Sequence, residues 1–305
     1  MTTTQGIPYS AEPDEVIDFN GRQIATFAVQ EGDNIDPVTV ASFGEEWSKF
    51  SEFSADEIIP MGNEYFDVVT EEMLNKNSVA LDLGCGTGRW SRYAAGRAGF
   101  VEAIDPSQAV LAASALTEDL DNIRITQAGV DNIPFPDDSF DFIFSLGVLH
   151  HIPDTTAALT TAVKKLKPGG HCLLYLYYAL DNRGPLFKLL FHTSGLFRAI
   201  ISKLPAGLKK LVCDLIAITV YLPFVLLVRI VKAVFGGKLY EKMPLHYYWD
   251  KTWNVIRNDS LDRFGTPLEQ RFTKQQISDM MNAAGLTDHK FSDGIPYWHV
   301  VGRKK

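Results

Sequence analysis

A glycine-rich turn between Leu81 and Arg89 is the segment best suited to bind a ligand. It reads Leu-Asp-Leu-Gly-Cys-Gly-Thr-Gly-Arg and follows a short apolar run, where a strand would give way to a helix. Glycines at such a point let the backbone turn sharply and approach a ligand closely. The spacing departs from the dinucleotide-binding fingerprint, because Arg89 stands where that fingerprint requires its third glycine. A nicotinamide-dependent dehydrogenase is therefore disfavoured.

Two adjacent histidines, His150 and His151, provide a second chemical signal further along the chain. Histidine titrates near neutral pH, so either residue could act as a general base. The alternative is that one of them only hydrogen-bonds the backbone. Tyr177 and Tyr178 are further candidates to line a pocket.

The segment that contains these residues alternates between strand and helix patterns. Strands are expected over residues 78–84, 100–105, 122–129, 139–147 and 170–178, with helical patterns between them. Such a repeat predicts an α/β fold, a doubly wound parallel sheet with helices on both faces. Ligands of these sheets bind at the carboxyl ends of the strands. The glycine turn and the histidines should therefore lie at one edge of the sheet.

The motifs together resemble those of class I S-adenosylmethionine-dependent methyltransferases of the small-molecule type, similar to methyltransferase domain family 11. The glycine turn resembles motif I, residues 103–107 the second-strand motif, 131–141 the segment before the fourth strand, 147–154 motif IV, and 166–170 the turn before the fifth strand. The resemblance covers about 78–180 and 270–303. It implies a seven-stranded, mostly parallel Rossmann-like sheet that ends in an antiparallel strand pair.

The resemblance also implies that S-adenosylmethionine is the methyl donor. Asp105, at the end of the second strand, would accept hydrogen bonds from the ribose hydroxyls. Asp82 would face the amino group of the methionyl part, or would only cap the turn. Gly84 and Gly86 would pass close to that part of the cofactor. The other expected contacts are Gly88, Pro106, Val130, Asp131 near the adenine, and the backbone of Ser145 and Leu146.

The expected activity is methyl transfer to a small or amphiphilic molecule. The histidines favour O-methylation, because an oxygen nucleophile often needs a base. Two alternatives to O-methylation remain. One is N- or C-methylation of a natural product or lipid-like acceptor, and the other is a non-catalytic cofactor-binding or scaffold protein. No Asn/Asp-Pro-Pro-aromatic tetrapeptide follows the fourth strand, which disfavours a nucleic-acid base as acceptor. No acidic constellation suggests a metal site, so no metal is expected.

The chain is expected to comprise four parts. Residues 1–77 form an N-terminal extension, 78–180 the cofactor-binding core, 181–268 a helical insertion that caps the acceptor pocket, and 269–305 a final helix with the antiparallel strand pair. Thr273 and Gly285 are the expected start and stop signals of that helix.

Within the N-terminal extension, Asn20-Gly21 predicts a β-hairpin between residues 15 and 29. Residues 41–75 have a helical pattern whose aromatic face would pack on the next domain or form a lid over a ligand. That face consists of Phe43, Trp47, Phe50 and Phe53.

The insertion differs in charge from the rest of the chain. Residues 183–242 contain ten basic side chains opposed only by Asp214 and Glu241, a net charge of +8, whereas the whole chain has −8. Basic charge combined with bulky apolar residues predicts either an interfacial helix on an anionic membrane or a soluble helical cap. The uncharged run Leu215–Val228 has 14 residues, and Pro223 is expected to interrupt it. The run is shorter than the roughly 20 residues that a transmembrane helix needs.

Composition excludes several other classes. An acidic total argues against a protein that coats nucleic acid. Three cysteines without a CxxC pair argue against a disulfide scaffold or a cysteine-type zinc knuckle. The first residues lack a basic region followed by an apolar one, so no secretory signal is expected. A cytoplasmic location is therefore predicted. Association with a membrane through residues 183–242 is the alternative. Composition leaves the oligomeric state open.

Overall fold

The computed structural model describes residues 6–47, 55–181, 184–236 and 239–305. By its internal contacts the chain divides into two compact units. The first consists of residues 1–181 and 268–305, and the second of residues 182–267.

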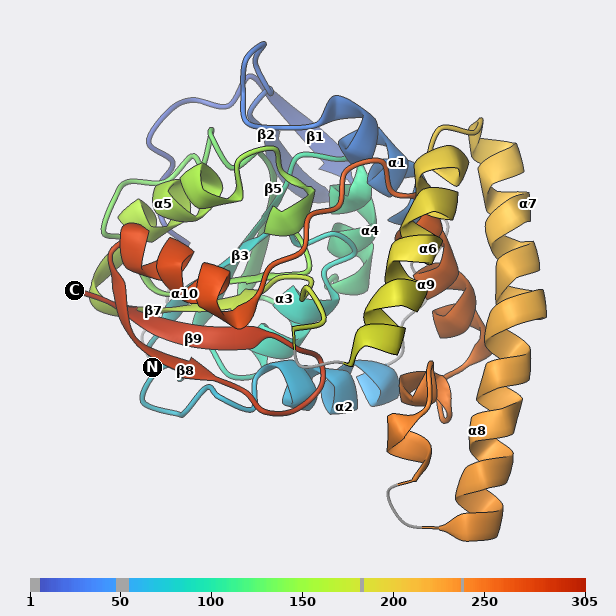
Figure 1. Cartoon of the computed structure of the whole chain (residues 1–305). Coiled ribbons are helices and arrows are strands. Elements are labelled where there is room, and N and C mark those ends of the chain that lie inside the picture. The colour runs from blue at the N-terminus through green and yellow to red at the C-terminus, as the bar shows by residue number, and fades with distance from the viewer. Residues whose placement is uncertain (1–5, 48–54, 182–183, 237–238) are drawn as a thin grey trace. The chain divides into compact units, whose positions relative to one another are not determined.

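A central mixed sheet organises the first unit (Figure 1). Its core strands are β5 (Ile123–Gln127), β4 (Phe100–Asp105), β3 (Val79–Leu83), β6 (Phe140–Leu146), β7 (Leu166–Tyr175), β9 (His299–Lys304) and β8 (Leu286–Phe291), in this spatial order. Neighbouring strands are parallel except that β9 runs antiparallel to both β7 and β8. The expected doubly wound sheet with a final antiparallel pair is therefore confirmed.

Within the described residues, the sheet has nine strands rather than the expected seven. The additional two are the hairpin strands β1 (Glu15–Phe19) and β2 (Arg22–Thr26), since β2 pairs in parallel with β5. Asn20 and Gly21 both have positive φ angles, 53° and 78°, as a tight hairpin turn requires. The hairpin itself was predictable from this turn. The pairing of β2 with the edge strand β5, about 100 residues away, was not predictable, because that contact has no local sequence signature.

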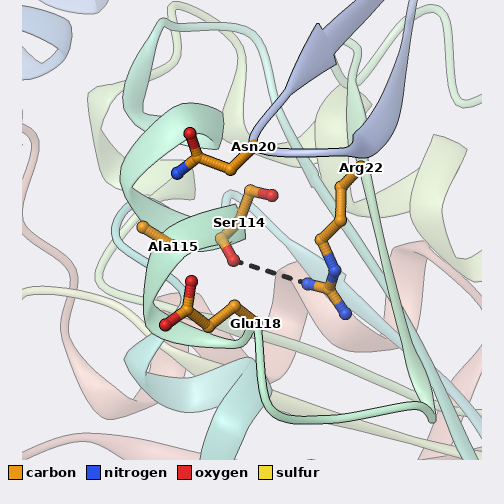
Figure 2. A pocket seen from close by; sticks show the side chains of 5 residues that line it. All are labelled: Asn20, Arg22, Ser114, Ala115 and Glu118. Carbon is orange, nitrogen blue, oxygen red and sulfur yellow. Dashed lines mark hydrogen bonds between the residues drawn. The ribbon is translucent and has the colours of Figure 1, made fainter.

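The hairpin is anchored to helix α4 (Ala109–Leu116) at a small pocket (Figure 2). Asn20, Arg22, Ser114, Ala115 and Glu118 line this cavity of about 220 Å³. The Arg22 guanidinium donates to the carbonyls of Ser114 (3.4 Å) and Leu120 (2.7 Å), which lie at or beyond the C-terminal half of α4. Because α4 starts near the carboxyl end of β4, this pocket lies at the opposite edge of the sheet from the glycine turn.

Helices cover both faces of the sheet, with one apolar cluster on each side. Phe135, Phe140 and Ile277 belong to one cluster, and Phe66 and Phe144 to the other. The helices of this unit are α1 (Pro37–Trp47), α2 (Ala55–Tyr65), α3 (Arg89–Ala95), α4, the short η1 (Leu149–His151), α5 (Thr155–Lys165) and α10 (Lys274–Ala283). Two layers of helices around one sheet satisfy the burial needs of apolar strands on both faces.

The helical expectations can be compared with the structure at residues 41–75 and at the start of α10. Within the expected helical region 41–75, the described residues form α1 up to Trp47 and α2 from Ala55 to Tyr65, and residues 66–78 form turns; residues 48–54 lie outside the described residues. Of the expected aromatic face, only Phe43 has a described side chain; the side chains of Trp47, Phe50 and Phe53 lie outside the described residues. The start signal of α10 is confirmed, since Thr273 and Gln276 form a reciprocal capping box.

The second unit is helical (Figure 1). Its elements are α6 (Pro185–Ile201), α7 (Ala206–Ile216), η2 (Ala217–Tyr221), α8 (Leu222–Phe235), η3 (Tyr240–Lys242), η4 (His246–Tyr248) and α9 (Trp253–Gly265). Gly195 lies inside α6 and does not interrupt it. The elements α7, η2 and α8 form one continuous helix, in which η2 is a π turn.

Pro223 was expected to interrupt this helix, and that expectation was wrong. Pro223 sits in the first turn of α8, directly after the π turn. A proline costs little in a first turn, and a π turn shifts the hydrogen-bond pattern locally. Among the described residues, Gly207–Phe235 is the helix that is long and apolar enough to cross a membrane, by length and composition alone.

Candidate functional site

The glycine turn after β3 lies against the carboxyl end of β4. The backbone N–H groups of Gly84 and Cys85 both donate to the carbonyl of Ile104, at 2.9 Å. Gly84 has a φ of +82°, and a Cβ there would overlap the side chain of Val148. Only glycine fits this position, because it has neither the conformational penalty nor the side-chain atom.

Replacing Gly84 by alanine is expected to lower the free energy of unfolding by about 2–4 kcal/mol, the sum of a left-handed backbone penalty and overpacking. Gly32→Ala is the matched control, since Gly32 has a φ of +97° but no atom within 4 Å of the point that a Cβ would occupy. Chemical denaturation of both variants measures the difference. Equal destabilisation would show that contact with Val148 is not what requires glycine here.

Asp105 ends β4 and holds the turn from the other side. Its carboxylate accepts hydrogen bonds from the backbone N–H of Gly86 (3.0 Å) and from the N–H and hydroxyl of Ser107 (2.9 and 2.6 Å). Burial raises the pKa of Asp105, while the bonds from Ser107 and Gly86 oppose that rise. A carboxylate has about four lone-pair sites, so Asp105 keeps capacity for a further donor such as a ribose hydroxyl.

Asp82, in β3, is the most deeply buried carboxylate beside the turn. Its side chain is 1% exposed, Oδ2 accepts from the hydroxyl of Ser91 (2.6 Å), and Oδ1 has no partner in the structure. Burial raises its pKa to about 7; the Ser91 bond opposes the rise, and repulsion from Asp105 adds to it. A buried acceptor without a donor is costly. The site therefore suits a ligand that carries an ammonium group.

The remaining expected contacts occupy the neighbouring strand ends. The Ser145 hydroxyl donates to the carbonyl of Leu83 (2.8 Å) and so ties β6 to β3. Leu146, at the end of β6, and Val130, after β5, are buried. The carbonyl of Pro106 accepts from the side-chain amide of Gln127 (3.2 Å).

Gly88 has a φ of +80° and is the residue from which α3 starts. Asp131, the acid expected near the adenine, has a partner within the protein. It accepts a hydrogen bond from the backbone N–H of Asn34, in the segment that precedes α1. Asn34 also exchanges two hydrogen bonds with the backbone of Asp154, at 2.7 and 2.8 Å. The N-terminal segment therefore reaches across the carboxyl edge of the sheet, and Asp131 helps to hold it.

The structure distinguishes the two adjacent histidines in η1. His151 Nδ1 lies 2.7 Å from the carbonyl of Leu268. A carbonyl oxygen only accepts, so Nδ1 carries the proton and the lone pair of the neutral ring is on Nε2. The His150 Nδ1 instead accepts from the backbone N–H of Tyr177 (3.4 Å), which places the proton of the neutral ring on Nε2. That Nε2 is buried and has no partner in the structure.

Burial also fixes the charge state of His150. Its side chain is fully buried and stacks on the ring of Tyr177, with ring centroids 3.8 Å apart. Burial, with smaller contributions from His151 and Arg271, lowers the pKa of His150 well below its ordinary value. His150 is therefore a neutral hydrogen-bond donor rather than an imidazolium.

A segment far along the chain, residues 268–272, closes over these histidines. Besides the Leu268 contact, the N–H of Gln270 donates to the carbonyl of His150 at 2.9 Å. Sequence reasoning missed these residues. They follow the helical insertion, 117 positions after His151, and both contacts use backbone atoms, which leave no residue-type signature.

The aromatic residues near η1 are only partly those expected. Tyr177 lies against His150, but Tyr178 packs on Tyr297 and Trp298 instead. Adjacent residues of an extended segment point to opposite faces, so both could not line one pocket. Phe43 of α1, from the expected aromatic face, lies edge-on to the His151 ring at 4.9 Å.

Residues 245–250 and 262–267, near the end of the expected acceptor cap, belong to the second unit. There Tyr248 and Phe264 are buried in the core of that unit, together with Cys213, Ala217 and Tyr221. Among the described residues, no group of three or more His, Cys, Asp or Glu side chains is arranged to hold a metal ion.

Residues 81–174 match the family model described as a methyltransferase domain. The demethylmenaquinone methyltransferase of Bacillus licheniformis is 29% identical over 165 residues, which cover 47% of this chain and 71% of that protein. That of Staphylococcus epidermidis is 35% identical over 128 residues, which cover 41% of this chain and 52% of that protein. The chain thus spans about half the length of several curated relatives that it matches.

A likeness to solved structures extends over more of the chain. The crystal structure of a SAM dependent methyltransferase from Aquifex aeolicus aligns with 85% of this chain and 96% of that one, at 14% identity and a TM-score of 0.47.

Proposed function

We propose that this chain, whose residues 81–174 match a methyltransferase-domain family, is an S-adenosylmethionine-dependent enzyme that methylates a hydroxyl group of a small or amphiphilic acceptor. S-adenosylmethionine is the methyl donor, and when bound it supplies a methyl group that its sulfonium already activates. The tasks left to the protein are to bind and orient the two molecules, to exclude water and to accept a proton.

The proposed binding of S-adenosylmethionine rests on two carboxylates beside the glycine turn, the buried Asp82 and the partly buried Asp105. Asp82 would hold the amino group through the oxygen that has no partner, and Asp105 would accept from the ribose. Asp105 and the ionised form of Asp82 also create a negative potential, which favours a ligand with ammonium and sulfonium charges. The glycines keep the backbone close enough for that contact.

The choice of a hydroxyl acceptor rests on the histidine pair. The bond from His151 to Leu268 leaves the His151 lone pair on Nε2, the state in which an imidazole can take a proton. The neutral His150 carries its proton on Nε2 and would donate to the acceptor oxygen. We propose that His151 is the general base and that His150 orients the acceptor.

Replacing His151 by glutamine is expected to lower kcat by about 10²- to 10⁴-fold, the usual contribution of a general base. The dissociation constant for S-adenosylmethionine should remain unchanged, because the base contacts the acceptor rather than the donor. Added imidazole should restore part of the activity. His171→Gln is the control, since His171 is half-buried in β7 and pairs with Arg303 of β9. Full activity of the His151 variant would rule out the proposed base.

A second candidate is N- or C-methylation of a natural product or lipid-like acceptor. The name of the relatives, demethylmenaquinone methyltransferase, favours it. Transfer of labelled methyl groups to a cell extract, followed by identification of the labelled atom, decides between the candidates. A label on carbon or nitrogen would replace the hydroxyl proposal, and binding of S-adenosylmethionine without any labelled product would favour a non-catalytic protein.

A further inference from the structure

The second unit, residues 182–267, has an apolar face that its own core does not use. Among the described residues, all but four of the strongly exposed large apolar side chains belong to this unit. Along the continuous helix 207–235 many of them recur on one stripe: Leu208, Leu211, Leu215, Ile218, Leu226, Ile230 and Val234. Leu211 and Ile230 are 56% and 57% exposed. An apolar surface of this extent marks an interaction site.

A different face of the same helix packs inside the unit. Cys213, Ala217, Tyr221 and Val225 are buried, at intervals of four residues, and belong to one cluster with Ile256 of α9. The exposed stripe is therefore not the packing face of this helix.

Basic residues flank the apolar run. Lys209 and Lys210 precede the uncharged stretch 215–228, and Arg229 and Lys232 follow it. The Lys232 ammonium lies 2.8 Å from the centroid of the Trp249 ring, and Arg229 Nε donates to the carbonyl of the same residue (2.7 Å). Tryptophan beside cations at the end of an apolar helix is the arrangement that suits the boundary between lipid headgroups and acyl chains. The net charge of +8 over residues 183–242 matches an anionic surface.

Polar contacts to α9 exclude a membrane-spanning arrangement of this helix. Asp214 forms an ion pair with Arg257 (2.8 Å), and the hydroxyl of Tyr221 donates to Asp259 (2.8 Å). The first bond reaches α9 from the N-terminal third of the helix, and the second from its middle. A helix that crossed the bilayer would carry these charged groups of α9 into the hydrocarbon, which is costly. A helix that lies flat keeps α9 on the aqueous side.

We propose that the second unit docks on an anionic lipid bilayer, with the helix 207–235 lying in the plane of the interface. The exposed stripe enters the boundary of the acyl chains, and the flanking lysines and Arg229 contact the phosphate headgroups. This proposal goes beyond the proposed function, because it holds whichever acceptor atom is methylated.

Vesicle flotation of the full chain tests the proposal. We expect it to float with vesicles of phosphatidylcholine and phosphatidylglycerol at low salt, and binding to weaken at about 0.5 M salt, where the Debye length is only a few ångströms. Vesicles of phosphatidylcholine alone should bind it less. The double variant Leu215→Glu with Ile230→Glu should lose binding by more than about tenfold, because carboxylates enter the acyl boundary and face anionic lipid.

The matched control is Val16→Glu with Val38→Glu. These residues are 50% and 64% exposed in the first unit, and the charge change is the same. Thermal unfolding should show that both double variants are folded. Four results would overturn the proposal: no flotation of the wild type at low salt, equal loss in both double variants, retention in the membrane after a carbonate wash, which indicates a spanning helix, or a lipid-free dimer that the Leu215/Ile230 variant alone dissociates.

Discussion

Replacing Asp105 by alanine should weaken S-adenosylmethionine binding by about 10- to 150-fold. A hydrogen bond to a charged group contributes about 1.5–3 kcal/mol, and the ribose hydroxyls would donate to this carboxylate alone. Isothermal titration calorimetry on wild type and variant measures the loss. Undiminished affinity would rule out the proposed contact between Asp105 and the ribose.

Two controls separate ligand contact from damage to the turn. Asp105 also accepts bonds from Gly86 and Ser107, so its removal could loosen the turn itself. Ser107→Ala removes one of these internal bonds and keeps the carboxylate, and it should cost little affinity. Asp121→Ala removes an exposed carboxylate that follows helix α4, and it should not change the affinity. If Ser107→Ala matched Asp105→Ala, the effect would come from the turn.

Replacing Asp82 by asparagine is expected to act in opposite directions on stability and on binding. The cofactor-free protein should become more stable at pH 8, by up to about 4 kcal/mol, because burial raises the pKa of Asp82 from 3.8 to about 7 and the charged form is costly there. Binding of S-adenosylmethionine should weaken by about 10- to 100-fold, since a charge-assisted bond to the amino group is lost.

The pH dependence gives this prediction its sign. Between about pH 4 and pH 7 the folded wild type holds a proton on Asp82 that the unfolded chain has released, so its stability falls as the pH rises. Asparagine does not titrate, and the gain in the variant therefore grows through this window and is complete above it. Denaturation at pH 4 and pH 8 measures this gain. An equal stability difference at both pH values would contradict a buried Asp82 carboxyl with a raised pKa.

The same carboxyl predicts how cofactor affinity depends on pH. An ammonium group needs the charged form of Asp82, so wild-type affinity should fall by up to tenfold for each pH unit below about 7 and level off above it. The affinity of the Asp82→Asn variant should not fall in this way below pH 7. Calorimetry at several pH values, in buffers with different ionisation enthalpies, shows whether a proton is released on binding.

Much of the fold was predictable from local signals. The alternation of strands and helices over residues 78–178, the glycine turn at Gly84 and the Thr273 cap are read within a few residues of each other, because strand period, turn conformation and capping are local properties. The carboxylates Asp82 and Asp105 were also found in this way, since parallel strands bring their carboxyl ends to one edge. Their burial and the partnerless oxygen of Asp82 were not visible in the sequence.

Contacts between distant segments were decided only by the tertiary structure. The hairpin at Asn20-Gly21 extends the sheet, Asn34 engages Asp131, and Leu268 determines which nitrogen of His151 carries the proton. Each depends on chain that returns from about 100 or more positions away and on backbone atoms that every residue possesses. The sequence alone therefore determined that two histidines and two carboxylates lie at the end of a sheet. The folded chain decided which of them is an acceptor, which a donor, and which remains without a partner, because packing and burial set those roles.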